Sequence, residues 1–104
     1  MDADKKRRLE AGGWRVGSAE ELLGLTPHEA AFIELRLSLA SALKERRKER
    51  RLSQCELAGR IGSSQSRVAK MEAGDPSVTV DLLVRALLAL GASPTDLAKA
   101  ILAA

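Results

Sequence analysis

The chain has 104 residues, of which 45% are hydrophobic, and its only aromatic residues are Trp14 and Phe32. We therefore expect one core built from Leu, Ala, Val and Ile, a composition that suits close-packed helices. The lone cysteine, Cys55, excludes an internal disulfide framework and fits a reducing cytoplasm. No apolar run approaches the roughly 18 residues of a membrane span and no signal peptide is visible, so no membrane partner is expected.

The formal net charge of +3 is concentrated in the middle of the chain. Residues 1–33 carry 5 basic and 6 acidic side chains, residues 34–74 carry 10 and 5, and residues 75–104 carry 2 and 3. The central excess suits a polyanionic partner, although a solvated helix face would give a local excess of the same size.

The N-terminal part of the chain indicates an arm followed by small elements. Residues 1–13 are charged and Gly-terminated, which favours an arm, and residues 14–16 indicate a short extended piece. Ser18 can cap a short helix over residues 19–23, with Glu21 at the capping-box position.

A long helix is predicted from Pro27 to about Arg50. Thr26 is its expected cap, Pro27 takes the first helical position and Glu29 completes a capping box. The apolar residues of this segment fall on more than one stripe. One stripe can pack on the domain core, and the other then needs the N-terminal segment, a second subunit or another protein. Burial by residues 14–25 alone is the simpler alternative.

Residues 53–74 predict two short helices joined by a tight turn. The first helix is expected over Gln54–Ile61, the turn at Gly62-Ser63 and the second helix over Ser64–Glu72. Four apolar residues of these helices are spaced so that they face the core: Leu57, Ile61, Val68 and Met71. Ala58 is small, so the second helix can approach the first. Gly62 suits a turn that needs a positive φ.

Two more helices are predicted after this motif. One runs over Val80–Leu90, capped by Thr79 and stopped by Gly91, and the last begins at Ser93-Pro94. The expected fold class is all-α. We divide the chain into an N-terminal arm and extension, residues 1–33, and a domain, residues 34–104, that holds the motif.

The motif resembles the helix-turn-helix of phage-repressor-type (Cro/C1, XRE) regulators, over about residues 36–103. The resemblance implies a five-helix, repressor-like DNA-binding domain. It implies base reading by Gln65, Ser66 and Lys70, and phosphate contacts by Gln54, Ser64 and Arg67. It also implies structural roles for Ala58, Gly62 and Val68, and a salt bridge that joins Arg47 of the first helix to Glu72 at the end of the reading helix. The alternative for Arg47 is a place in the basic end of the first helix without such a bridge.

The side-chain chemistry agrees with these roles. Gln65 can pair bidentately with adenine and Lys70 can donate to guanine, whereas Ser64 and Arg67 would add register and affinity. Ser66 is short where some relatives carry a longer amide, so a phosphate or water contact is the alternative there. His28 is the only histidine, and no catalytic constellation, metal site or cofactor is predicted.

The resemblance implies a sequence-specific repressor that acts in the cytoplasm, at the nucleoid, as a homodimer on a palindromic double-stranded operator. Residues 14–47, taken with the motif and residues 71–93, also resemble small HigA-type antitoxins, whose partner is an endoribonuclease toxin and which repress their own operon. A stand-alone phage-like regulator is the alternative. A third possibility is a helical protein-interaction domain that has lost DNA binding, against which the intact polar and basic residues argue.

Overall fold

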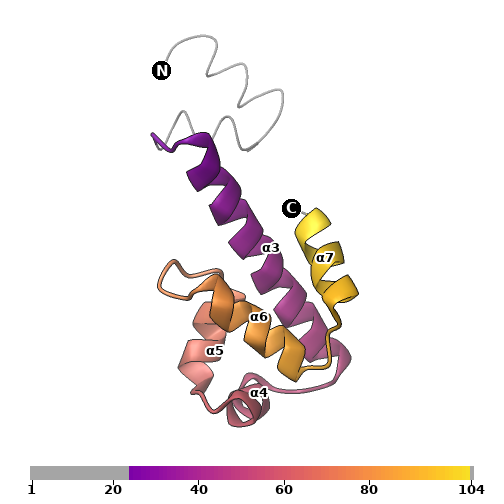
Figure 1. The fold of residues 1–104 in the computed structure, drawn as a ribbon. Helices are drawn as coiled ribbons and strands as arrows, with labels where there is room; N and C mark the ends of the chain where they lie inside the picture. Colours follow the sequence, from indigo (N-terminus) through magenta and orange to yellow (C-terminus); the bar gives the residue numbers. More distant parts are fainter. Residues whose placement is uncertain (1–23, 104) are drawn as a thin grey trace, which may run out of the picture. The chain divides into compact units, whose positions relative to one another are not determined.

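The computed structural model describes residues 24–103, and five helices and no strands occur in this part of the chain (Figure 1). The helices are α3 (Pro27–Glu49), α4 (Gln54–Ile61), α5 (Gln65–Glu72), α6 (Val80–Ala89) and α7 (Pro94–Leu102). The predicted all-α fold is confirmed. The arm, the extended piece and the short helix predicted within residues 1–23 lie outside the described residues.

The long helix α3 begins where its capping residues predict. The Thr26 hydroxyl accepts the N–H of Glu29 at 3.3 Å, and the Glu29 carboxylate accepts the N–H of Thr26 at 3.2 Å. These reciprocal bonds satisfy backbone donors that the first turn leaves unpaired. The helix ends one residue before the predicted Arg50, and Arg51 follows with a φ of 55°.

The chain divides into two compact units, Met1–Glu34 and Leu35–Ala104. The boundary falls within α3, one residue after the division between residues 33 and 34 that we predict from the sequence. The division into an arm and a DNA-binding domain itself stays a prediction.

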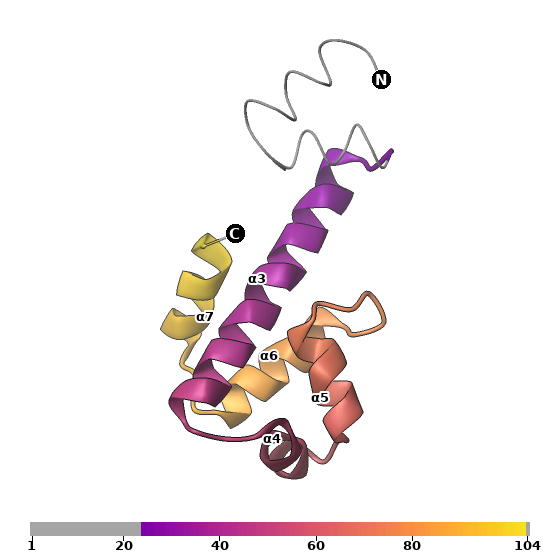
Figure 2. The ribbon, with the colours of Figure 1, turned by 180° about the vertical axis from the view of Figure 1, so that it is seen from behind.

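The core of the second unit is built from small and branched aliphatic side chains, as the composition predicts. Both views show α4, α5 and α6 gathered around the C-terminal part of α3 (Figures 1 and 2). α4 packs against α5 and α6. The largest side chains with less than 2% exposure are Leu39, Leu43, Leu57, Met71, Leu83, Leu90 and Val68. This shared core fixes the positions of the short motif helices, which would be too short to be stable alone.

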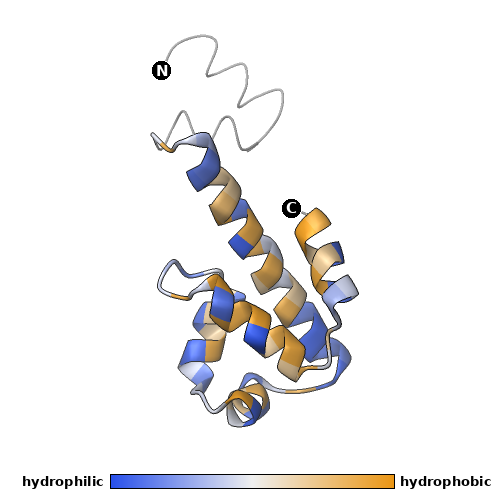
Figure 3. Cartoon of the chain, viewed as in Figure 1, coloured by the Kyte–Doolittle hydropathy of each residue, from blue (hydrophilic) through white to orange (hydrophobic). Residues whose placement is uncertain are grey.

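The last helix, α7, lies beside the same part of α3 in both views (Figures 1 and 2). The Ser38 hydroxyl donates to the carbonyl of Ala100 at 2.5 Å. Arg46 of α3 also pairs with Asp96 of α7 at 3.0 Å. A Ser93–Asp96 capping box begins α7 and, with Arg46 nearby, lowers the pKa of the Asp96 carboxyl. The end of α7 is apolar and exposed (Figure 3).

Candidate nucleic-acid interface

The first motif helix, α4, has the predicted bounds, and its ends explain why. The Ser53 hydroxyl accepts the N–H of Glu56 and the Glu56 carboxylate accepts the N–H of Ser53, each at 3.0 Å. This capping box lowers the pKa of Glu56. At the other end, Gly62 has a φ of 65°. A left-handed residue at this point ends the helix and turns the chain toward α5.

The second motif helix, α5, begins one residue later than the sequence predicts. Ser64 is extended, with φ −109° and ψ 158°, and its hydroxyl accepts the N–H of Arg67 at 3.2 Å. Ser64 is therefore the N-cap and not the first helical residue, because a serine side chain can replace the missing partner of a first-turn N–H. Its hydroxyl also lies 3.3 Å from that of Ser66.

The inner faces of α4 and α5 pack together as their spacing predicts. Leu57, Val68 and Met71 have no exposed surface, and Ala58 is buried at the crossing. Ile61 also packs against the core, as predicted, but its side chain is only partly buried. This packing leaves the other face of α5 toward solvent.

The outward face of α5 carries four exposed polar or basic side chains: Gln65, Ser66, Arg67 and Lys70. Gln54, at the start of α4, is partly buried beside them, and Ser64 is exposed at the cap. Gln54 and Gln65 contact each other, as do Ser64 and Ser66, and Arg67 and Lys70 lie exposed on the same short helix as Gln65 and Ser66.

An ion pair joins α3 to the end of α5. Arg47 Nε lies 2.5 Å from Glu72 Oε2, and Arg47 Nη2 lies 2.9 Å from Glu72 Oε1. Arg47 Nη1 also donates to the carbonyl of Leu52 at 2.7 Å. The two side chains are only 11% and 3% exposed. Because burial opposes the Coulomb attraction, we expect the net stabilisation by this pair to be small.

The pKa values of the pair keep both groups charged. Hydrogen bonding to Glu72 raises the pKa of Arg47. Burial raises the pKa of Glu72, but hydrogen bonds from Arg47 and Gln54 outweigh it, so the Glu72 pKa lies below its ordinary value.

A chain of hydrogen bonds continues from this ion pair to the first residue of α5. Gln54 Nε2 donates to Glu72 Oε1 at 3.2 Å, and Gln65 Nε2 donates to Gln54 Oε1 at 2.6 Å. This connection was not predicted from the sequence. The available signal was that the only two glutamines in the chain begin the two motif helices.

A family model described as helix-turn-helix matches residues 43–97, which is more than half of the 104 residues. The chain belongs to the helix-turn-helix family of the Cro/C1 (XRE) type. The match runs from the last turns of α3 to the start of α7 and includes the whole motif. The chain is therefore a DNA-binding transcription regulator. No curated protein and no solved structure matches it.

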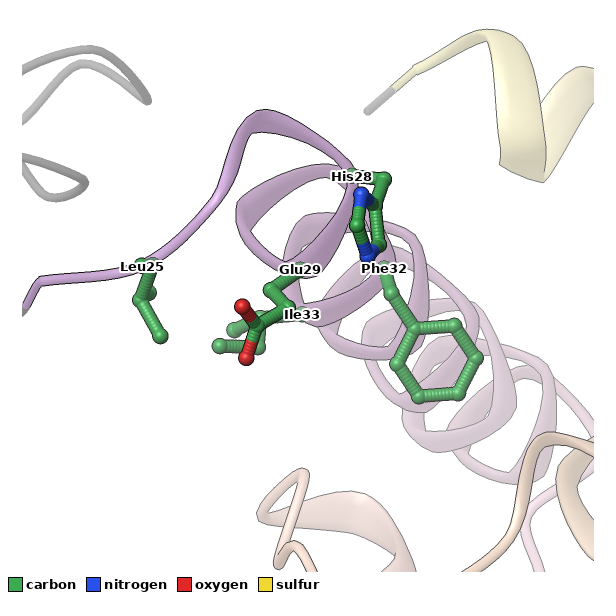
Figure 4. Close-up of a pocket in the computed structure, with 5 residues that line it drawn as sticks. All are labelled: Leu25, His28, Glu29, Phe32 and Ile33. Carbon is green, nitrogen blue, oxygen red and sulfur yellow. The ribbon is translucent and has the colours of Figure 1, made fainter.

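The N-terminal unit of this helix-turn-helix protein contains a pocket of about 470 Å³, lined by Leu25, His28, Glu29, Phe32 and Ile33 (Figure 4). All but Leu25 project from the first two turns of α3. Its polar groups belong to the helix cap: the Thr26 hydroxyl bonds the Glu29 carboxylate at 2.8 Å and lies 3.4 Å from the His28 ring nitrogens. The pocket walls thus bring no set of polar groups together around a ligand.

Residues 24–103 contain no group of three or more His, Cys, Asp and Glu side chains that could hold a metal ion. None of the helices described is long and apolar enough to cross a membrane.

Proposed function

We propose that the chain is a sequence-specific transcriptional repressor in which α5 enters the DNA major groove. The observation that carries this proposal is the exposed face of α5, with two hydrogen-bonding and two cationic side chains over a fully buried inner face. The major groove admits a helix and presents a distinct donor and acceptor pattern for each base pair.

The base-reading roles fall to Gln65, Lys70 and, at shorter reach, Ser66. Gln65 stands at the first helical position of α5, and Lys70 lies about one and a half turns later. An amide can accept from adenine N6 and donate to adenine N7, whereas an ammonium group can donate to guanine O6 and N7. Each contact of this kind discriminates by about 1–3 kcal/mol.

The phosphate contacts are assigned to Gln54, Ser64 and Arg67, which border the base-reading residues. Arg67 supplies a permanent positive charge at an exposed position. Gln54 and Ser64 retain hydrogen-bonding capacity beyond their contacts within the protein. Such contacts set register and affinity but carry little sequence information.

A homodimer on a palindromic operator would double this surface. One reading helix covers only a half-site, and two copies would occupy half-sites about 34 Å apart. Exposed apolar side chains at Leu88, Ile101 and Leu102 offer surface for a second copy. The dimer would act on the nucleoid in the cytoplasm.

We further propose that the repressor is the antitoxin of a type II toxin–antitoxin pair, with an endoribonuclease toxin as its partner. Support comes from the resemblance of residues 14–47 and 71–93 to small HigA-type antitoxins. Phe32 and Leu37, each about half exposed on α3, are candidate contacts for a protein partner. A stand-alone regulator without a toxin is the alternative. Co-purification of the chain with the product of a neighbouring toxin-sized reading frame, and rescue of growth by co-expression, would separate the two.

Base reading is tested with the double variant Gln65→Ala/Lys70→Ala. Binding is measured by fluorescence anisotropy on the fragment upstream of the gene and on a scrambled duplex. We expect the preference for the upstream fragment to fall by about 10-fold or more, since two base contacts are lost. Arg85→Ala is the control, because it also removes one positive charge but from an exposed site on α6. Equal selectivity in the double variant and the wild type would refute the assignment.

A further inference from the structure

The two hydrogen bonds that connect Gln65 to Glu72 through Gln54 can run in only one direction. A carboxylate accepts and cannot donate. The Gln54 atom that lies 3.2 Å from Glu72 Oε1 must therefore belong to the amide NH₂ group. The carbonyl oxygen of Gln54 then faces Gln65, whose Nε2 lies 2.6 Å away. Gln65 must donate to Gln54, and its own orientation is fixed in turn.

This direction decides what Gln65 can offer to a base. One N–H of its amide is occupied by Gln54, which leaves the carbonyl oxygen and the second N–H. One acceptor and one donor match adenine, which presents N6–H and N7 in the major groove. Guanine presents two acceptors, O6 and N7, at the same edge. If Gln54 were turned over, Gln65 would accept from Gln54 and present two donors, which suits guanine.

We propose that Glu72 is a specificity-determining positioning residue, which acts through Gln54 to fix the orientation of the Gln65 amide and thereby selects adenine over guanine without touching DNA. The inference rests on the proposed base reading by Gln65.

The position of Glu72 suits this role. Its side chain is 3% exposed, and two bonds from Arg47 hold it in place. Its lowered pKa keeps it an anion, and hence an acceptor only, at neutral pH. Turning Gln54 over would bring its carbonyl oxygen against the carboxylate, so that a hydrogen bond would be replaced by repulsion between two acceptors.

The direction of the bonds can be measured in the free protein. The chain has no asparagine and only two glutamines, so the side-chain amide NH₂ signals in a ¹⁵N spectrum come from Gln54 and Gln65 alone. Scalar coupling across a hydrogen bond links the donor nitrogen to the carbon of the accepting carbonyl. We expect coupling from Gln65 Nε2 to Gln54 Cδ. Coupling in the opposite direction, or in neither, would overturn the inference.

The consequence for base choice is measured with the full chain on DNA selected from a randomised duplex library. The relevant position is the one at which Gln65→Ala loses its base preference. On duplexes that differ only there, the wild type should favour adenine over guanine by about 5- to 150-fold. In Glu72→Gln this ratio should approach one, because a side-chain amide can present either an acceptor or a donor to Gln54.

Two further variants separate orientation from stability. Gln54→Leu leaves the Arg47–Glu72 pair in place and should lose the same adenine preference, together with affinity for both duplexes. Glu56→Gln removes one carboxylate from an exposed capping box, which glutamine also supports, and should keep the preference. Circular dichroism checks that each variant is folded.

The outcomes distinguish the inference from the function on which it rests. If Gln65→Ala leaves every base preference unchanged, base reading by Gln65 is refuted and the role of Glu72 falls with it. If Gln65→Ala loses a preference that Gln54→Leu and Glu72→Gln both keep, base reading stands and the role of Glu72 is refuted.

Discussion

Three Gly→Ala substitutions should change stability in different directions, although the chemical change is the same. Gly59 lies within α4, and a Cβ there would meet no atom within 4 Å. Gly62 has equal space but a φ of 65°. Gly74 combines a φ of 71° with a Cβ position 2.4 Å from Leu37 Cδ2. The series therefore separates helix propensity, left-handed backbone strain and steric contact.

The expected magnitudes follow from these environments. Gly59→Ala should stabilise the fold by about 0.5–1 kcal/mol, because alanine loses less backbone entropy in a helix. Gly62→Ala should destabilise it by about 1–2 kcal/mol, the cost of a side chain in the left-handed region. Gly74→Ala should cost at least as much as Gly62→Ala. The added contact is with the end of a half-exposed leucine side chain, which can rotate away, so the excess should be small.

Thermal and urea unfolding followed by circular dichroism would measure the series. For a unit of this size, each kcal/mol shifts Tm by about 4–8 °C. A lower Tm for Gly59→Ala would contradict the helical, open environment of residue 59. An unchanged Tm for Gly62→Ala would show that the turn does not need a left-handed residue.

Two further predictions concern the core and the ion pair. Leu83→Ala should destabilise the protein by about 2–5 kcal/mol, since Leu83 has no exposed surface, and urea unfolding with a loss below about 1 kcal/mol would contradict its place in the core. The Glu72 pKa is lowered from 4.5, so Glu72 contributes stability that is fully present above about pH 4.5 and is lost as the pH falls through its lower folded pKa. Glu72→Gln should therefore be less stable at neutral pH but lose less stability on acidification, and parallel pH profiles of Tm for the two proteins would refute this reasoning.

Local signals in the sequence predict most of the helix boundaries. Thr26 and Thr79 each accept a first-turn N–H as expected, and Gly62 makes the predicted turn. Ser53 and Ser93 cap their helices in the same way, although the sequence analysis predicts only the helix starts there. These features depend on residues a few positions apart, so spacing alone identifies them. The predicted start of α5 at Ser64 is wrong by one residue, because the sequence cannot show whether a serine lies within the first turn or caps it.

Contacts between distant residues were harder to predict. The Arg47–Glu72 pair was expected only through the family resemblance, since 25 residues separate its members. The bonds that link Gln54 to Glu72 and to Gln65 depend on the angle at which α4 and α5 pack, which periodicity does not specify. The second apolar stripe of α3 was predicted as a surface that needs a partner. Phe32 and Leu37 lie on different stripes of this helix and each is about half exposed, so which stripe a partner covers stays a prediction.

The most direct test of the account is the affinity of the protein for the fragment upstream of its own gene, compared with a scrambled duplex across a salt series. Fluorescence anisotropy, with a dye on the single, exposed cysteine or on the DNA, would measure the affinity for each of the two duplexes. We expect the upstream fragment to bind about 10³-fold or more tightly than the scrambled duplex, with both affinities falling as salt rises. Equal affinities that vanish steeply with salt would leave only phosphate contacts and contradict sequence-specific repression at this site.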